Sequence, residues 1–276
     1  MCLAEWMRRR DRVLVMGILN TTPDSFYDGG KYTSVDAAVA RARKLIAEGA
    51  DIIDVGGESS RPGAAPVPAE VELSRVVPVI EQIRGESDVA ISVDTTKSVV
   101  ARAALAAGAD IVNDISALRF DPEMASVIAD TGAYVVLMHM QGTPRTMQEN
   151  PTYTDPVAEI KTFLANRIAA AIHAGIDEAR IILDPGIGFG KCLKHNLAIL
   201  RRISEFKELG VPILIGLSRK SFLGEILGVP TEDRLIGTVA ANAVAIRNGA
   251  DIIRVHDVKE GKQTAQVARR LRDDAA

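Results

Sequence analysis

The chain has 276 residues, of which 47% are hydrophobic and 25% charged, and its formal net charge is −3 at pH 7. This composition is typical of a globular protein and excludes a disordered chain, and the slight negative charge excludes a basic field that would recruit nucleic acid. The two cysteines, Cys2 and Cys192, lack a CxxC spacing, which argues against a disulfide framework or a thiolate metal site and is compatible with a reducing, cytoplasmic location.

Residues 1–12 contain the basic run Arg8-Arg9-Arg10, which we interpret as part of a solvated N-terminal tail. No apolar stretch of about 7–15 residues follows these charges, so we expect no signal peptide. No run of about 18 apolar residues occurs in the chain, so we expect no membrane-spanning helix.

A glycine-led unit recurs after this tail. Gly49-Ala50-Asp51-Ile52-Ile53 returns as Gly108-Ala109-Asp110-Ile111-Val112 and as Gly249-Ala250-Asp251-Ile252-Ile253. In each copy the glycine ends a helix and an apolar run begins at once, which is typical of strands buried on both faces. Together with the other apolar runs, the unit predicts eight strands, at residues 13–20, 51–58, 89–95, 110–115, 134–139, 180–184, 212–218 and 251–257.

Each predicted strand is followed by a helical pattern. In the first of these helices Ala38, Ala42 and Leu45 share one face. Eight alternating strand–helix units with short connections predict an α/β fold, namely a single-domain (β/α)8 TIM barrel over residues 13–276. An open, doubly wound sheet is the alternative.

Polar residues gather where the predicted strands end: Asn20, Glu58, Asp94, Asn113, His139, Asp184, Ser218, Arg254 and His256. A buried polar group costs roughly 1–3 kcal/mol if unpaired, and the carboxyl ends of the strands form the active site of a TIM barrel. We therefore predict the functional site at these ends, with mutual pairing inside the barrel mouth as the alternative for any single residue. Of the four histidines, His139 and His256 are candidates, whereas we expect His173 and His195 to be structural or on the surface.

The segments beyond the strand ends are also informative. Residues 20–30 and 58–64 are rich in glycine, proline and small polar residues, which suits mobile lids, although plain surface loops are the alternative. Residues 184–191 lack the spacing of a phosphate-binding P-loop. Lys220 and Ser221 open a helix and form a candidate anion site, with a Schiff base on Lys220 as the alternative. The histidines lack carboxylates at zinc-ligand spacing, so Mg²⁺ held by Asn20 and substrate phosphates fits better.

Several of these segments resemble the signatures of dihydropteroate synthases. They are residues 17–30 (GILNTTPDSFYDGG), 54–63 (DVGGESSRPG), 184–191 (DPGIGFGK), 218–221 (SRKS) and 254–257 (RVHD). Members of this family join 6-hydroxymethyl-7,8-dihydropterin diphosphate to p-aminobenzoate, which gives 7,8-dihydropteroate and diphosphate in folate biosynthesis. The resemblance also implies a homodimer and sensitivity to sulfonamides.

The resemblance implies a role for each matching residue. The pterin would be held by Asp94, Asn113, Asp184 and Lys220. Catalysis, with loss of diphosphate before the amine attacks, would depend on Asp94, Lys220, Asp28 and Arg61. The diphosphate would be bound by Asn20, Ser60, Arg61, Arg254 and His256, with Mg²⁺ at Asn20. The p-aminobenzoate would contact Phe26, Pro62, Phe189 and Ser221.

Ser60 stands where many members of the family have threonine, and the hydroxyl is kept. Two other functions remain open. A folate-dependent methyltransferase, which passes a methyl group to a corrinoid protein, needs a pterin site but neither the two long loops nor the pocket at Arg61 and Pro62. A non-catalytic paralogue would bind a pterin without making dihydropteroate.

Overall fold

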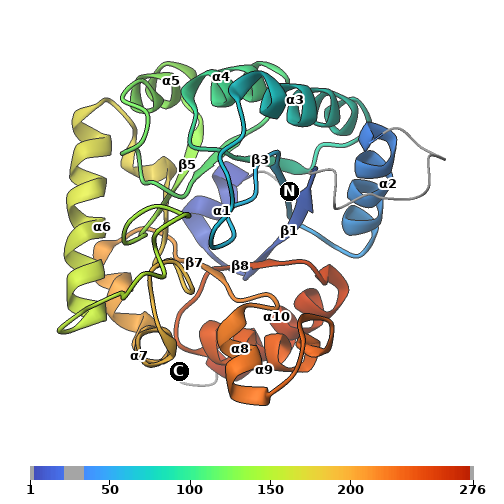
Figure 1. The fold of residues 1–276 in the computed structure, drawn as a ribbon. Helices are drawn as coiled ribbons and strands as arrows, with labels where there is room; N and C mark the ends of the chain where they lie inside the picture. Colours follow the sequence, from blue (N-terminus) through green and yellow to red (C-terminus); the bar gives the residue numbers. More distant parts are fainter. Residues whose placement is uncertain (1–2, 22–33, 274–276) are drawn as a thin grey trace.

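Strands and helices alternate along the chain (Figure 1), and the structure, a computed structural model, describes residues 3–21 and 34–273. The strands are β1 (Leu14–Asn20), β2 (Ile52–Gly56), β3 (Ala90–Asp94), β4 (Ile111–Asp114), β5 (Tyr134–Met138), β6 (Ile181–Asp184), β7 (Leu214–Gly216) and β8 (Ile252–Val255). Each observed strand lies within a predicted range and is up to four residues shorter, because residues at the ends of the predicted ranges lie outside the regular ladder.

The helices connect the strands and surround them. They are α1 (Leu3–Arg9), α2 (Ser34–Ala47), α3 (Ala69–Glu86), α4 (Ser98–Ala106), α5 (Met124–Thr131), α6 (Pro156–His173), α7 (Leu193–Arg201), α8 (Ser221–Leu227), α9 (Leu235–Arg247) and α10 (Val258–Asp273). Short 3-10 turns lie at η2 (Glu178–Arg180), η3 (Ile203–Leu209) and η4 (Thr231–Asp233). Within the described residues no helix is long and apolar enough to cross a membrane.

The strands form one parallel ring. β1 pairs with β2 on one side and with β8 on the other, and the remaining neighbours follow the chain order. Between β6 and β7 the ring closes through the isolated bridge from Leu183 to Ile213, and the Leu183 N–H donates to the Pro212 carbonyl at 2.9 Å. The predicted TIM barrel is therefore confirmed, and the open, doubly wound sheet is excluded.

Alternate residues of each strand face the inside of the barrel, and the chemistry of this inner face changes along the strand. At the amino ends the inner face is apolar, with Leu14, Met16, Ile52, Ala90, Ile111, Val136, Ile182, Leu214 and Ile252 in one buried cluster. Two residues further on, Ile52 is followed by Asp54 and Ile252 by Arg254. The outward-facing residues, such as Ile53, pack beneath the helices. Polar groups therefore enter the barrel at its carboxyl end.

The first helix, α1, closes the amino end of the barrel (Figure 1). Leu3, Trp6 and Met7 belong to the same cluster as the inner apolar residues, and Trp6 is 2% exposed. The Trp6 Nε1–H donates to the Arg12 carbonyl at 2.7 Å. The prediction of a solvated tail is therefore wrong for α1: the exposed Arg8 and Arg9 lie on the polar side of a helix whose apolar side is buried.

Candidate active site

Arg254 organises the polar layer at the carboxyl end of the barrel. Its Nε donates to Asp54 Oδ2 at 2.6 Å and its Nη2 donates to Asp94 Oδ2 at 2.7 Å. Asn113 Nδ2 donates to the same Asp54 oxygen at 3.2 Å. Burial opposes the charge on Arg254, but Asp54 and Asp94 raise its pKa above the ordinary value, so the guanidinium stays charged.

Asp54 is a member of this network that was not predicted from the sequence as a site residue. Its side chain is completely buried, and its Oδ1 has no hydrogen-bond partner among the described residues. The glycine-led repeat contained the signal, because Asp54, Asn113 and Arg254 all stand five residues after the repeat glycine. Inward-facing residues of alternate strands form layers along the barrel axis. The repeat places these three residues, on β2, β4 and β8, in one layer, where their side chains meet.

Asp94 ends β3 and faces the same space as Asn20. A Cβ atom built on Gly56 would lie 3.5 Å from Asp94 Cβ and 3.8 Å from Asn20 Oδ1, so the bare backbone of Gly56 separates the two side chains. Burial raises the pKa of Asp94 to about 7, since the opposing effect of Arg254 is only partial and Asp54 adds a like charge. Asp94 is therefore a carboxyl group that changes its protonation near neutral pH.

Asp184 and Lys220 form the opposite side of the layer. Asp184 Oδ1 accepts a 2.7 Å hydrogen bond from the Gly186 N–H, and burial raises the pKa of Asp184 although Lys220 acts against it. Burial lowers the pKa of Lys220 to about 8, with Asp184 opposing. The Lys220 ammonium donates to the Ile187 carbonyl and lies 4.7 Å from the centroid of the Phe189 ring, which is a cation–π contact.

The two candidate histidines have different surroundings. His256 Nδ1 lies 2.9 Å from Ser218 Oγ, and burial together with the charge of Arg254 lowers its pKa to about 4, so the ring is neutral at pH 7. His139 instead lies outside the barrel mouth, where its Nδ1 is 3.0 Å from Lys191 Nζ and its ring meets Phe163 edge-on. His139 is therefore not brought into the site. His195 is buried at the start of α7, which agrees with a structural role.

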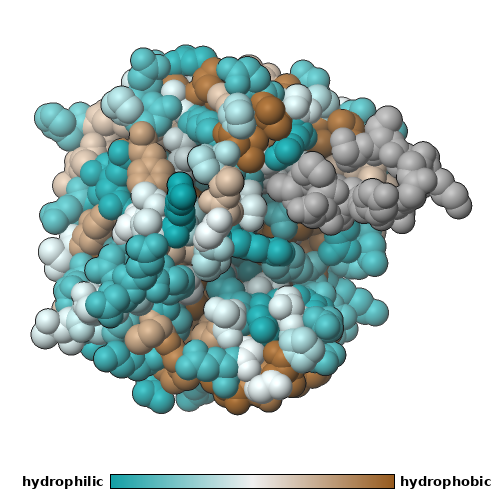
Figure 2. Space-filling view, in the orientation of Figure 1, coloured by the Kyte–Doolittle hydropathy of each residue, from teal (hydrophilic) through white to brown (hydrophobic). Residues whose placement is uncertain are grey.

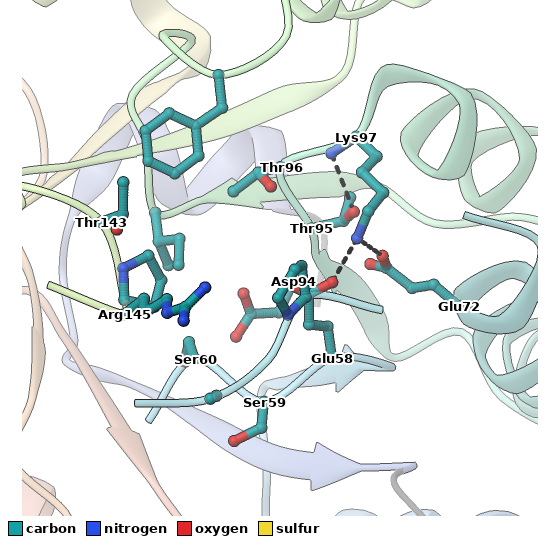
Figure 3. A pocket seen from close by; sticks show the side chains of 15 residues that line it. Glu58, Ser59, Ser60, Glu72, Asp94, Thr95, Thr96, Lys97, Thr143 and Arg145 are labelled. Carbon is teal, nitrogen blue, oxygen red and sulfur yellow. Dashed lines mark hydrogen bonds and ion pairs between the residues drawn. The ribbon is translucent and has the colours of Figure 1, made fainter. Parts of the chain in front are cut away.

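The second loop lies at the rim of this layer. A cavity of about 320 Å³ opens beside Asp94 (Figure 3), and Ser60 from the loop after β2 lines it. Arg61 and Pro62 are exposed, and the charge of Arg61 is among those that lower the pKa of His256, which places it near the polar layer. Ser221 is exposed at the first position of α8. Phe26 and Asp28, predicted for the first loop, lie outside the described residues.

The geometry suits the binding of a flat, polar heterocycle with an anionic substituent. Carboxylates and an amide line the inside of the barrel, and cations lie on both sides of them, namely Arg254 and Lys220. The described residues contain no cluster of three acidic, histidine or cysteine side chains that could hold a metal by themselves. Asn20 provides one hard oxygen donor beside Asp94, which fits a Mg²⁺ ion whose other ligands are phosphate oxygens and water.

Comparisons with known proteins agree with this geometry. The family described as pterin-binding enzymes matches residues 16–256. The dihydropteroate synthase of Escherichia coli K12 is 51% identical over 253 residues, which cover 92% of this chain and 89% of that protein. The corresponding protein of Synechocystis is 48% identical over 267 residues, with 96% and 91% covered.

Solved structures give the same relationship. The dihydropteroate synthase of Xanthomonas albilineans with 4-aminobenzoic acid has a TM-score of 0.90 and 49% identity, covering 96% of this chain and 94% of that one. The Yersinia pestis enzyme in complex with a sulfonamide drug has a TM-score of 0.90 and 46% identity, with 95% of both chains covered. The chain therefore belongs to the pterin-binding enzymes and, within them, to the dihydropteroate synthase family.

Proposed function

We propose that the chain condenses 6-hydroxymethyl-7,8-dihydropterin diphosphate with p-aminobenzoate to give 7,8-dihydropteroate and diphosphate. The observation that carries this proposal is the polar layer at the carboxyl end, where Arg254 bridges Asp54 and Asp94 beside Asn113, opposite Asp184 and Lys220. The related Xanthomonas albilineans enzyme has been seen in complex with 7,8-dihydropteroate, the product of this reaction.

The pterin ring is recognised by complementary hydrogen bonds. Its 2-amino-4-oxo edge presents adjacent N–H donors, and a carboxylate accepts such donors in pairs. Asp184 provides the carboxylate, which is held in place by the hydrogen bond that it accepts from the Gly186 N–H. Asn113 and Lys220 provide further donors for ring nitrogens and the carbonyl oxygen, and Asp94 accepts from the opposite edge.

The reaction separates charge before it forms the new bond. The C–O bond to the diphosphate breaks with its electron pair leaving on oxygen, so that a cation remains on the pterin methylene carbon. The amine lone pair of p-aminobenzoate then forms the C–N bond, and the nitrogen loses a proton. Asp94, ionised above its pKa of about 7, stabilises this cation. Preorganised charge of this kind, rather than an enzyme nucleophile, lowers the barrier.

The leaving diphosphate is held by the cationic and hydroxyl groups at the rim. Arg254 donates to Asp54 through Nε and to Asp94 through Nη2, and its Nη1 has no hydrogen-bond partner among the described residues and can donate to the diphosphate. Ser60 and Arg61 extend from the second loop, and the neutral His256 offers a ring nitrogen. Asn20 would hold Mg²⁺, which supplies positive charge to neutralise the departing phosphate oxygens.

The p-aminobenzoate binds above Lys220. The apolar surface for the ring of p-aminobenzoate is provided by Pro62 and by Phe189, whose ring contacts the Lys220 ammonium. Ser221 provides a hydroxyl for the carboxylate of p-aminobenzoate. By resemblance Phe26 and Asp28 of the first loop complete the site. A sulfonamide imitates this substrate, and the Yersinia pestis relative has been solved with such a drug, so we expect sulfonamides to inhibit this chain.

We also propose that the chain forms a homodimer through α8, α9 and α10. Large apolar side chains are exposed on these helices, and Figure 2 shows hydrophobic surface at the lower edge of the molecule. They are Ile226, Leu227, Ile236, Val244, Val267 and Leu271. Ile236, which is 77% exposed, offers a direct test of this interface. In sedimentation, Ile236→Asp should have the mass of a monomer, and an unchanged dimer mass would contradict the interface.

We further propose a cytoplasmic location, which the free thiol of Cys192 supports.

The decisive experiment measures diphosphate release from the pterin diphosphate with Mg²⁺, with and without p-aminobenzoate. Release coupled to dihydropteroate formation, and lost in Asp184→Ala and Lys220→Ala, establishes the activity. Tight pterin binding without release would instead favour the non-catalytic paralogue. Transfer of a methyl group from methyltetrahydrofolate to a corrinoid protein would favour the methyltransferase.

A further inference from the structure

The loop between β2 and α3 has a fixed stem. Glu58 begins the loop, and its Oε2 accepts a 3.0 Å hydrogen bond from the N–H of Val67 at the other end. Arg75 of α3 donates to the Gly57 carbonyl at 2.8 Å. The two ends of residues 59–66 are therefore joined through one carboxylate, and that carboxylate helps to place Ser60, which lines the cavity, and the exposed Arg61 and Pro62 that follow it.

Lys97 holds this carboxylate. Its Nζ donates to Glu58 Oε2 and, at 2.5 Å, to Glu72 Oε2 of α3, and Figure 3 shows the ammonium between the two carboxylates. Glu72 is completely buried, and its second oxygen, Oε1, has no partner among the described residues. Lys97 follows β3 three residues after Asp94, so one short segment connects the loop stem with the strand end that bears Asp94.

The packing around this ion cluster leaves little freedom. A Cβ atom on Gly57 would lie 2.9 Å from Glu72 Cγ and 2.9 Å from Val76 Cγ1, so α3 touches the backbone of the stem directly. Further along the loop, the Gly63 N–H donates to the Pro144 carbonyl at 3.1 Å. The stem thus depends on buried charge, whereas the tip is attached through a backbone hydrogen bond to another loop.

We propose that Lys97 is a positioning residue for the second loop: by neutralising Glu58 and Glu72 it fixes the stem so that Ser60, Arg61 and Pro62 meet the substrates beside Asp94. The inference rests on the proposed function, because it concerns the residues assigned to diphosphate and p-aminobenzoate. Without the ammonium, two carboxylates would repel each other at the stem and add negative charge beside the site for an anionic leaving group.

The test is Lys97→Met, which keeps the length of the side chain and removes its charge. We expect the KM values for p-aminobenzoate and for the pterin diphosphate to rise by about ten-fold to a hundred-fold, the range that displacement of a positioned group produces. The Kd of 6-hydroxymethyl-7,8-dihydropterin itself should remain within about two-fold, because Asp184, Asn113 and Lys220 hold the ring. Lys97→Arg, which keeps the charge, should recover most of the loss.

Two further variants separate positioning from folding. Lys161→Met is the matched control, because Lys161 pairs with Glu208 at 2.5 Å and is 28% exposed, compared with 24% for Lys97, but lies away from the loop. Lys97→Met combined with Glu72→Gln removes the uncompensated buried charge and should restore thermal stability while the raised KM values persist. If the KM values return to normal together with stability, the role of Lys97 is only structural and the proposal is wrong.

Hydrogen exchange of the Val67 amide provides a readout that does not need turnover. Exchange should accelerate in Lys97→Met and remain unchanged in Lys161→Met. Absence of turnover in the unmodified chain would refute the proposed function alone. Normal turnover together with unchanged KM values and unchanged Val67 exchange in Lys97→Met would refute the positioning role alone.

Discussion

The two ends of the barrel are formed by the same eight strands but have opposite chemistry. At the amino end, α1 fills the ring with Leu3, Trp6 and Met7, and the charge of Asp51 is paired with Lys262 at the edge. At the carboxyl end, charged groups lie inside the ring, and Asp54 Oδ1 remains without a partner among the described residues. The amino end is therefore built for stability, and the carboxyl end accepts unfavourable burial of charge because a ligand makes use of it.

The largest expected effect is on stability, at the amino end. Trp6→Ala removes a buried indole and its hydrogen bond to Arg12, and we expect the free energy of unfolding to fall by about 3–5 kcal/mol. Urea unfolding measures this loss. At a temperature where the variant is still folded, kcat should be unchanged. A loss of kcat without a loss of stability would show that the two ends are not separate in function.

The next effect is on chemistry, at the carboxyl end. Lys220→Met removes the ammonium above Phe189 and should lower kcat/KM by about 10²–10³-fold, as loss of a preorganised donor does. The loss of stability should be smaller than in Trp6→Ala, because removing the buried ammonium partly offsets the loss of its interaction with Asp184. The control is Lys262→Met at the opposite end, whose partner is Asp51. Equal activity losses in the two variants would contradict the division between the ends.

The pH dependence of activity sharpens the same division. Because burial raises the pKa of Asp94 to about 7, kcat/KM should fall by about ten-fold per pH unit below that value. Stability should respond in the opposite direction: the native state holds a proton that the unfolded chain, with an ordinary pKa of 3.8, has released, so the stabilisation present at low pH is lost as the pH rises through 7. In Asp94→Asn both pH dependences should be absent, which rate and urea measurements check.

The smallest effect concerns the residue that the sequence did not identify as part of the site. The charge of Asp54 raises the pKa of Asp94, so Asp54→Asn should move the acid limb of the pH–rate profile to lower pH. The asparagine oxygen can still accept from Arg254, which keeps the geometry. A limb that does not move, or moves upward, would rule out Asp54 as a source of the raised pKa.

Strands and strand ends were predictable because parallel strands buried on both faces leave a long apolar run that ends at a polar residue. This pattern identified Asp94, Asn113, Asp184 and Arg254, which the structure brings together. The same pattern wrongly included His139. β5 ends at Met138, and the side chain of the next residue, His139, points out of the barrel toward Lys191; the sequence alone does not show at which residue the strand ends. The helix α1 was not predicted because arginines dominate the composition of this short segment. Its three buried residues, Leu3, Trp6 and Met7, can be recognised as core residues only once the barrel end against which they pack is known.

Asp54 and Lys97 show a second limit of the sequence. Each lies in or near a recognised motif, yet its role depends on partners 200 and 39 residues away, Arg254 and Glu58. The repeat places Asp54 and Arg254 at equivalent positions, but no sequence pattern specifies which side chains form hydrogen bonds with each other, because that depends on the packing of the folded barrel. The sequence therefore predicts which end of the barrel holds the site, but not the charge network inside it.

The seam between β6 and β7, which closes through an isolated bridge, has a thermodynamic consequence. Asp184 ends β6, and Lys220 follows β7, so the two groups proposed to grip the pterin stand on either side of the most sparsely hydrogen-bonded junction in the ring. A ligand that binds both Asp184 and Lys220 connects the two strands across this junction. We therefore expect the bound heterocycle to link β6 to β7 and to stabilise the closed ring against local opening at this junction.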